Sequence, residues 1–393
     1  MNDMPPIALL PTGFYDLLPP VAEREAEVAA RLMAVLASHG YERVKPPLVE
    51  FEETLLSGAG AAMSGESFRT MDPTSHRMVA VRADMTPQVA RIAGTRLGHY
   101  PRPLRLSYAG QVLRVKGSEV RPERQLGQAG AELIGAEGPA ADVEVIAVAA
   151  EALLGVGVPD LSVDLTVPTL VPAIADEFEF PADKRAALRF ALDHKDTAAV
   201  AALAGRAGPL LTALVAAAGG AAQARPALDA LDLPTRARVE RDRLGAVIDG
   251  LTAAMPGLMV TVDPVENRGF EYHTGISFTF FARNETRRGA LGELARGGRY
   301  DAGDPAMPEP ATGFTLYTDT ILATLPEAPA RRRLLVPPGA DRALAAVLRG
   351  ADQGGWITVA ALAPADDWHA EAVRLGCGYV LEDGKPVPVR ERR

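Results

Sequence analysis

Two neighbouring segments, 104–114 and 125–134, constrain the fold of this chain more than any other feature. In the first segment Leu106 and Tyr108 alternate with polar residues, which is the side-chain period of a β-strand. A charged connection, residues 115–124, joins this segment to the next one. The two segments therefore predict a pair of antiparallel strands.

The second of these strands divides into two faces. By its period of two, one face carries Gln128, Gly130 and Glu132. The other face carries small and apolar residues: Ala129, Ala131 and Leu133. The polar face can be the floor of a binding site, where the glycine lets a ligand approach the backbone, or it can simply face solvent. From the pattern alone, a solvent-facing side is the more common case.

The segment before this hairpin predicts a strand that leads into a helix. Met78 to Val81 has strand character, Thr86 suits a helix N-cap, and Pro87 suits the first helical position. Arg82, Asp84 and Thr86 lie between them. Polar side chains at the start of a helix are well placed to meet a small ligand.

Near the N-terminus, residues 21–39 have the apolar spacing of an amphipathic helix that Gly40 ends. Residues 41–44 predict a short strand, which Pro46 and Pro47 interrupt. A helix, a strand and a proline in this order can form a dimer interface.

The second half of the chain divides into three parts. Residues 182–255 are rich in alanine and predict a helical insertion. Strands follow at 258–262 and 276–281, then a tight basic turn at 296–301 and a helix from Gly313 to about Leu325. A linker rich in proline and arginine precedes a short α/β piece, with strands at 334–336 and 357–360 and a helix at 340–349. The domain prediction is 1–330, with the insertion at about 170–256, and 331–393.

Composition excludes several classes of protein. The chain has 393 residues, a net charge of −9 and one cysteine, Cys377, so it has no intrachain disulfide and fits a reducing cytoplasm. No apolar run reaches the length of a membrane span. The six histidines lack metal-ligand spacing, and Gly58–Gly60 is followed by no Lys-Ser/Thr pair, so neither a metal nor another cofactor is expected.

These segments together resemble the histidyl-tRNA synthetase family, over about residues 10 to 325. Tyr108-x-Gly-x-x-x-Arg114 with the Gln128 to Glu132 strand is similar to class II motif 2, and Pro47 stands where motif 1 has its proline. Arg268-Gly-x-x-Tyr272 and Arg296-Gly-Gly-Arg-Tyr-Asp301 resemble the pieces that recognise histidine. The resemblance implies an α+β fold of class II aminoacyl-tRNA synthetase type. This is an antiparallel sheet flanked by helices, with a helical insertion and the short C-terminal α/β piece.

The resemblance also implies a histidine pocket. The positions that carry over are Asp84, Thr86, Arg114, Gln128, Glu132, Arg268, Tyr272 and His273. Asp84 replaces a family glutamate and His273 replaces a tyrosine. Carboxylates at Asp84 and Glu132 suit the ammonium of an amino acid, and Arg268 or Arg114 suits its carboxylate. Tyr272, with His273, is expected to meet the imidazole.

The residues that bind ATP in the synthetases do not carry over. Lys116 stands where the family has a glutamate that reads adenine, and Leu126 stands where an aromatic ring stacks on it. In motif 3, Tyr317 replaces a glycine and Thr320 replaces the arginine that grips the phosphates. Loss of that arginine removes charge stabilisation that adenylation needs, so no catalytic residues are expected.

A histidine pocket without ATP or tRNA machinery resembles the regulatory subunits of ATP phosphoribosyltransferase. This implies a homodimer within a hetero-oligomer, a short-form catalytic subunit as the partner, and feedback inhibition by histidine in the first step of histidine biosynthesis. The alternatives are an active or divergent histidyl-tRNA synthetase, or a histidine sensor with another partner. Two side-chain readings also stay open. Arg299 and Asp301 form a structural pair or contact ligand, and His273 is a pocket wall or a packed core residue.

Overall fold

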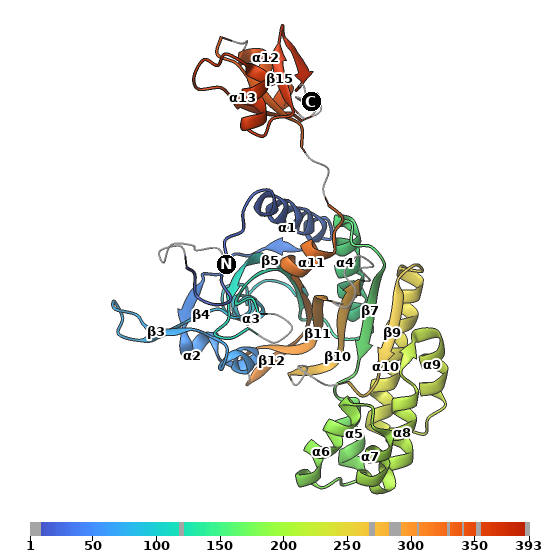
Figure 1. Cartoon of the computed structure of the whole chain (residues 1–393). Helices are drawn as coiled ribbons and strands as arrows, with labels where there is room; N and C mark the ends of the chain where they lie inside the picture. Colours follow the sequence, from blue (N-terminus) through green and yellow to red (C-terminus); the bar gives the residue numbers. More distant parts are fainter. Residues whose placement is uncertain are drawn as a thin grey trace. The chain divides into compact units, whose positions relative to one another are not determined.

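The computed structural model describes residues 9–117, 122–266, 272–282, 292–304, 306–327, 331–339, 342–350 and 355–389. The chain divides into two compact units, Met1–Leu325 and Pro326–Arg393 (Figure 1). Arg268, one of the predicted histidine contacts, lies outside the described residues.

A mixed, mainly antiparallel sheet forms the centre of the first unit, in the order β1-β5-β6-β12-β11-β10-β7-β9-β8. Its strands are β1 (Glu42–Arg43), β5 (Leu104–Leu113), β6 (Gln125–Ile134), β7 (Leu161–Thr166), β8 (Gly219–Gly220), β9 (Met259–Asp263), β10 (His273–Ala282), β11 (Glu293–Asp304) and β12 (Met307–Tyr317). The strands from β5 to β7 pair antiparallel, and so do β8 and β9, whereas β1 pairs parallel with β5 and β9 pairs parallel with β7. The predicted α+β class is confirmed.

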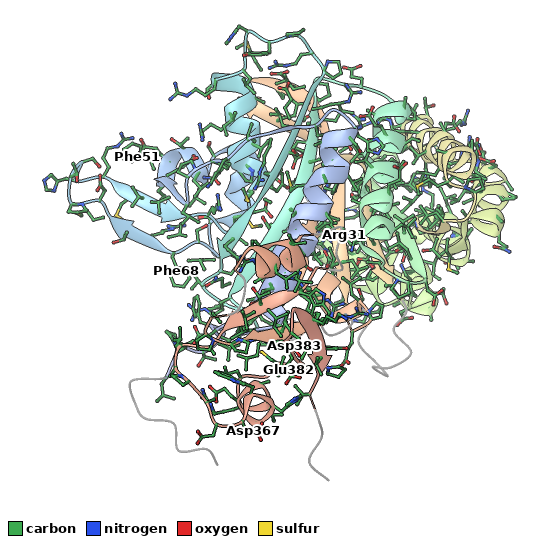
Figure 2. The ribbon with its side chains drawn as sticks, turned by 90° about the horizontal axis from the view of Figure 1, so that it is seen from above. Arg31, Phe51, Phe68, Asp367, Glu382 and Asp383 are labelled. Atoms are coloured by element: carbon green, nitrogen blue, oxygen red, sulfur yellow. The ribbon has the colours of Figure 1, made fainter. Side chains whose placement is uncertain are left out.

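The predicted hairpin is also confirmed. β5 and β6 pair antiparallel with Tyr108 opposite Gly130. Ala129, Ala131 and Leu133 enter the main hydrophobic core, which lies under α1 (Val21–Ser38) and α4 (Pro139–Val156). Arg31 on α1, labelled in Figure 2, donates to the carbonyl of Gly155 and links the two helices.

The opposite face of the sheet is buried too, so the solvent-facing reading of the polar side of β6 is wrong. Gln128 and Glu132 are each 1% exposed. α3 (Thr86–Thr95) covers this side together with η2 (Gly58–Met63). A small sheet of β2 (Val49–Phe51), β4 (Met78–Val81) and β3 (Arg69–Met71) lies next to them, with α2 (Glu52–Leu55) beside it.

Two predicted elements near the end of this unit are wrong. Residues 296–301 belong to strand β11 and make no turn, and Gly313 to Tyr317 belong to β12, so that the helix α11 spans only Thr318–Thr324. The glycines in β11 serve close packing. A Cβ on Gly297 would lie 2.3 Å from the Gly313 carbonyl oxygen and 2.3 Å from the Phe278 ring.

Helices make up most of the stretch between β7 and β9. They are α5 (Leu170–Glu177), α6 (Ala182–Asp193), α7 (Thr197–Leu203), η3 (Gly205–Ala207), α8 (Gly208–Ala216), α9 (Ala221–Asp229) and α10 (Thr235–Ala254). Across the described part of the chain, no helix is both long and apolar enough to cross a membrane.

The second unit has its own four-stranded sheet, in the order β14-β13-β15-β16. Its elements are β13 (Arg333–Val336), α12 (Arg342–Arg349), β14 (Ile357–Ala360), α13 (Trp368–Arg374), β15 (Tyr379–Glu382) and β16 (Lys385–Pro388). Cys377 is buried in its core beside Leu335 and Val380.

Candidate functional site

Polar side chains from four strands and the start of α3 enclose a cavity of about 90 Å³. Its lining includes Asp84, Thr86, Arg114, Glu132, Tyr272, His273, Arg296, Tyr300, Thr315 and Tyr317. The volume exceeds that of a single water site, yet it is far below the roughly 300 Å³ at which pockets for drug-sized ligands begin. The cavity therefore suits a small molecule.

Glu132 lies at the bottom of this cavity. Three hydroxyl groups donate to its carboxylate: Thr86 Oγ1 at 2.9 Å, Tyr108 at 3.3 Å and Tyr300 at 2.9 Å. Burial raises the pKa of Glu132 to about 8, although these hydrogen bonds oppose the shift. A carboxyl group buried at this position can accept a hydrogen bond from a ligand N–H without competition from bulk water.

Gly313 makes room for this carboxylate. It pairs with Glu132 across β12 and β6, and a Cβ at Gly313 would lie 1.8 Å from Glu132 Oε2. The glycine therefore lets the Glu132 side chain lie across the neighbouring strand.

Asp84 forms the second carboxylate of the site, nearer to solvent than Glu132. It accepts hydrogen bonds from the backbone N–H of Thr86 at 2.8 Å and from Gln128 Nε2 at 3.0 Å. The Gln128 oxygen accepts from the Met85 N–H at 3.2 Å, which fixes the orientation of the amide. Thr86 thus touches both carboxylates, one through its N–H and one through its hydroxyl.

The predicted role of Thr86 as a helix cap is wrong. Thr86 is the first residue of α3, and its hydroxyl donates to Glu132 and makes no cap hydrogen bond. Arg82 is also misplaced in the prediction. Its guanidinium is buried away from the cavity, where it donates to the carbonyls of Gln111 and Pro46.

Aromatic rings and arginines form the rest of the wall. The ring of Tyr272, a side chain that is 39% exposed, stacks beside His273 with the ring centroids 4.0 Å apart. His273 is 6% exposed and lines the cavity, so it is a buried pocket wall. Arg114 lies 3.5 Å from Glu66, and Arg296 lies 3.3 Å from Glu293.

Arg299 is structural and does not face the cavity. It forms a buried ion pair with Asp142 at 2.9 Å and donates to the carbonyls of Ala136 and Gly138. Its partner is thus Asp142 and not the predicted Asp301.

The structure brings together the predicted residues that it describes. Of these, Asp84, Thr86, Arg114, Glu132, Tyr272 and His273 line the cavity, and Gln128 orients Asp84. The predicted contacts do not include Arg296, Tyr300, Thr315 or Tyr317, although the segment 296–301 resembles a piece that recognises histidine. Their signal was available, because Arg296, Gly298 and Tyr300 share one face of β11 by period two once that segment is recognised as a strand.

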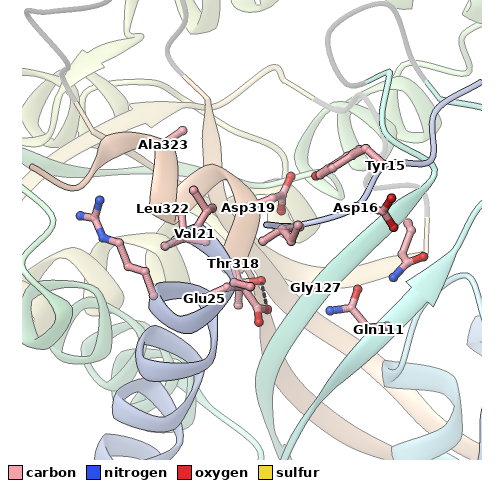
Figure 3. Close-up of a pocket in the computed structure, with 14 residues that line it drawn as sticks. Tyr15, Asp16, Val21, Glu25, Gln111, Gly127, Thr318, Asp319, Leu322 and Ala323 are labelled. Carbon is pink, nitrogen blue, oxygen red and sulfur yellow. Dashed lines mark hydrogen bonds between the residues drawn. The ribbon is translucent and has the colours of Figure 1, made fainter. Parts of the chain in front are cut away.

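A larger cavity, of about 620 Å³, lies on the other face of β6 (Figure 3). Tyr15, Asp16 and Glu25 line it together with residues of α11. Gly127 lines this cavity and faces Thr318 and Glu25, on the side of β6 opposite to Gln128 and Glu132. The larger cavity is therefore distinct from the candidate site.

Throughout the described ranges, no group of three or more His, Cys, Asp and Glu side chains is arranged to hold a metal ion.

Comparison with known proteins first defines the class. The family model for histidyl-tRNA synthetase matches residues 13–321, which is most of the chain. The chain therefore belongs to the histidyl-tRNA synthetase family, in agreement with its fold and with the residues of the cavity.

The nearer relatives then narrow the family. The chain is 58% identical to the ATP phosphoribosyltransferase regulatory subunit of Paramagnetospirillum magneticum, over 95% of this chain and 96% of the other. It is 56% identical to the protein of the same name from Rhodospirillum centenum, over 99% and 98%. The chain thus belongs to the ATP phosphoribosyltransferase regulatory subunits.

A solved structure shares the fold. It is described as an ATP phosphoribosyltransferase regulatory subunit/histidyl-tRNA synthetase from Bacillus halodurans, and it matches with a TM-score of 0.79 over 94% of this chain and 97% of the other. At 23% identity this likeness supports the architecture alone.

Proposed function

We propose that this chain binds free histidine in the 90 Å³ cavity and regulates a short-form ATP phosphoribosyltransferase catalytic subunit in the cytoplasm. In this proposal the chain has no catalytic activity of its own. It forms a homodimer within a hetero-oligomer, is required for the activity of its partner, and transmits feedback inhibition by histidine. The observation that carries the proposal is a small cavity lined by two carboxylates and two arginines, with an amide that orients Asp84, and these groups together match a zwitterionic amino acid.

The register of the sheet orders the contacts along the ligand. Glu132 is level with Gly313 on β12, whereas Gln128, which holds Asp84, is level with Tyr317. The two levels are four residues apart on β6, or roughly 13 Å of strand. Thr86 bonds to both carboxylates, so Asp84 and Glu132 lie within reach of one small ligand, and we place one end of the ligand at Glu132 and the other at Asp84.

We assign the imidazole to the Glu132 end. Its N–H donates to the buried carboxylate, and Tyr272 and His273 flank the ring, since His273 pairs with Tyr300 at that level of the sheet. The ammonium then lies at Asp84, and the carboxylate reaches Arg114. This assignment moves Glu132 from the ammonium, where the sequence placed it, to the imidazole. Contact of Arg268 with the carboxylate remains a prediction.

Three positions argue against use of ATP. Lys116 is exposed, Leu126 is buried in an apolar cluster with Tyr108 and Val112, and Tyr317 fills part of the cavity wall. An active or divergent histidyl-tRNA synthetase would need each of these positions to serve a nucleotide.

Calorimetric titration of the purified chain with histidine and then with ATP tests the proposal. We expect histidine to bind and ATP not to bind. Binding of ATP would restore the synthetase alternative, and absence of histidine binding, both to the free chain and to its complex with the catalytic subunit, would refute the pocket.

The regulatory part needs the reconstituted complex. We expect Glu132→Ala to abolish inhibition by histidine while co-purification with the catalytic subunit is unchanged, because the buried carboxylate faces the cavity and no surface. Asp164→Ala is the matched control, since that carboxylate on β7 is partly buried against Thr261, outside the cavity lining. Unchanged inhibition in Glu132→Ala would contradict the assignment.

A further inference from the structure

Arg296 lines the cavity but is not among the individual histidine contacts predicted from the sequence, although it begins the segment 296–301 that resembles a piece recognising histidine. On β11 it shares a face with Gly298 and Tyr300, and the Tyr300 hydroxyl donates to Glu132. Arg296 pairs across the sheet with Thr315, which lies on the cavity wall two residues before Tyr317. The strand register therefore puts Arg296 level with Gly130, two residues from Glu132 in the direction of Gln128 and Asp84.

A second arginine, Arg114, lines the same cavity. It follows β5, and both arginines make their glutamate ion pairs through Nε, at 3.5 Å for Arg114 and 3.3 Å for Arg296. These distances are long for a charge-assisted hydrogen bond. Because a guanidinium has five N–H donors, it can serve a glutamate and a ligand carboxylate together.

Tyr317 lines the cavity at the level of Gln128. It is 6% exposed and lies opposite Gln128 in the sheet. The charges of Glu293, Asp84, Arg296 and Arg114 all act on its hydroxyl, so it lies among the groups that would surround a ligand carboxylate.

We propose that Arg296 and Arg114 together bind the free α-carboxylate of the amino acid, and that Tyr317 excludes any group attached to that carboxylate. This inference rests on the proposed histidine site and specifies how the site distinguishes its ligand. The pocket then recognises free histidine and rejects its alcohol, amide and ester. A synthetase site must leave this end of the amino acid open for reaction with ATP, whereas a sensor gains selectivity when this end is closed.

Calorimetric titration of the full chain with histidine, histidinol and histidinamide tests the inference. For the wild-type chain we expect histidinol and histidinamide to bind at least about 100-fold more weakly than histidine, because neither offers the two arginines a ligand carboxylate. Equal affinity for histidine and histidinol would overturn the inference while leaving the histidine site intact. No binding of histidine would instead overturn the proposed function itself.

Variants at Arg296 locate the effect. We expect Arg296→Ala to weaken histidine binding by about tenfold to a hundredfold while histidinol binding changes little, so that the ratio of the two dissociation constants collapses. Arg296→Lys keeps the charge and should recover part of that ratio. It also gives a second reading if the alanine variant folds poorly. If both variants kept the wild-type ratio of the two dissociation constants, the ligand carboxylate would not bind at Arg296.

Two further variants complete the test. Arg105→Ala is the matched control, because Arg105 is an ion-paired arginine of similar exposure. Its partner is Glu144 of α4, on the face of the sheet opposite to the cavity. Arg105→Ala should leave the ratio unchanged. Tyr317→Gly should admit histidine methyl ester, and continued rejection of the ester by this variant would show that Tyr317 does not set the limit.

Discussion

Replacing Glu132 with Gln should remove a pH-dependent decrease in the free energy of unfolding of the chain without histidine. Burial raises the pKa of Glu132 from 4.5 to about 8 in the folded chain, whereas the unfolded chain releases that proton near 4.5. Between these two values the folded state holds a proton that the unfolded state has lost. The free energy of unfolding therefore falls as the pH rises from 4.5 to 8, and it is independent of this group outside that window.

The expected magnitude follows from the two pKa values. One pKa unit corresponds to about 1.4 kcal/mol, so between pH 6 and pH 8 this carboxyl group lowers the free energy of unfolding by about 2 kcal/mol. Gln keeps the shape and stays neutral, and the hydroxyls of Thr86, Tyr108 and Tyr300 can rotate to accept from its amide. The variant should thus gain about 2 kcal/mol relative to the wild type when the pH rises from 6 to 8.

Urea denaturation followed by far-UV circular dichroism, without histidine, measures this double difference. Glu144→Gln is the control. Its pair with Arg105 lowers the pKa of Glu144, so that group is ionised in both states from pH 6 to pH 8 and its replacement should cost the same at both. Parallel pH profiles for the wild type and Glu132→Gln would refute the reasoning, since they would mean that Glu132 is ionised in the empty pocket.

Three further predictions concern the buried ion pair, the Glu132 site and the two units. Arg299→Met should destabilise the first unit by about 3–5 kcal/mol in denaturation, because it leaves Asp142 buried without its cation; a loss below 1 kcal/mol would contradict the buried pair. Gly313→Ala should reduce histidine affinity in calorimetry by at least about tenfold, since its Cβ would displace the Glu132 carboxylate, and wild-type affinity would show that this carboxylate does not contact the ligand. Both tryptophans, Trp356 and Trp368, belong to the second unit, so tryptophan fluorescence should follow that unit while circular dichroism follows both; coincident transitions would indicate a single cooperative unit.

Local patterns predicted much of the architecture. The alternation in 104–114 and 125–134 predicted the hairpin, and the apolar spacing of 21–39 predicted α1. Each prediction held because a period of two is typical of strands and a period of 3.6 is typical of helices. The prediction failed in β11, where Gly297 and Gly298 look like a turn in the sequence. There the glycines fit the close approach of neighbouring strands, and no local pattern distinguishes that use from a turn.

The candidate site shows the same division. Motif similarity selected Asp84, Gln128 and Glu132, because side chains that share a strand face or begin a helix can be read from spacing. Spacing could not show that Glu132 is buried with three hydroxyl partners, nor that Arg299 belongs to Asp142, 157 residues away in the sequence.

The sequence by itself determined the types of element, the family and the residues that can bind an amino acid. Only the tertiary structure decided which of those residues meet. It turned a polar strand face inward, brought Arg296 and Tyr317 to the same cavity, and raised the pKa of Glu132. The physical reason is that periodicity is a property of neighbouring residues, whereas burial and electrostatic environment depend on groups that the pairing of distant strands brings together.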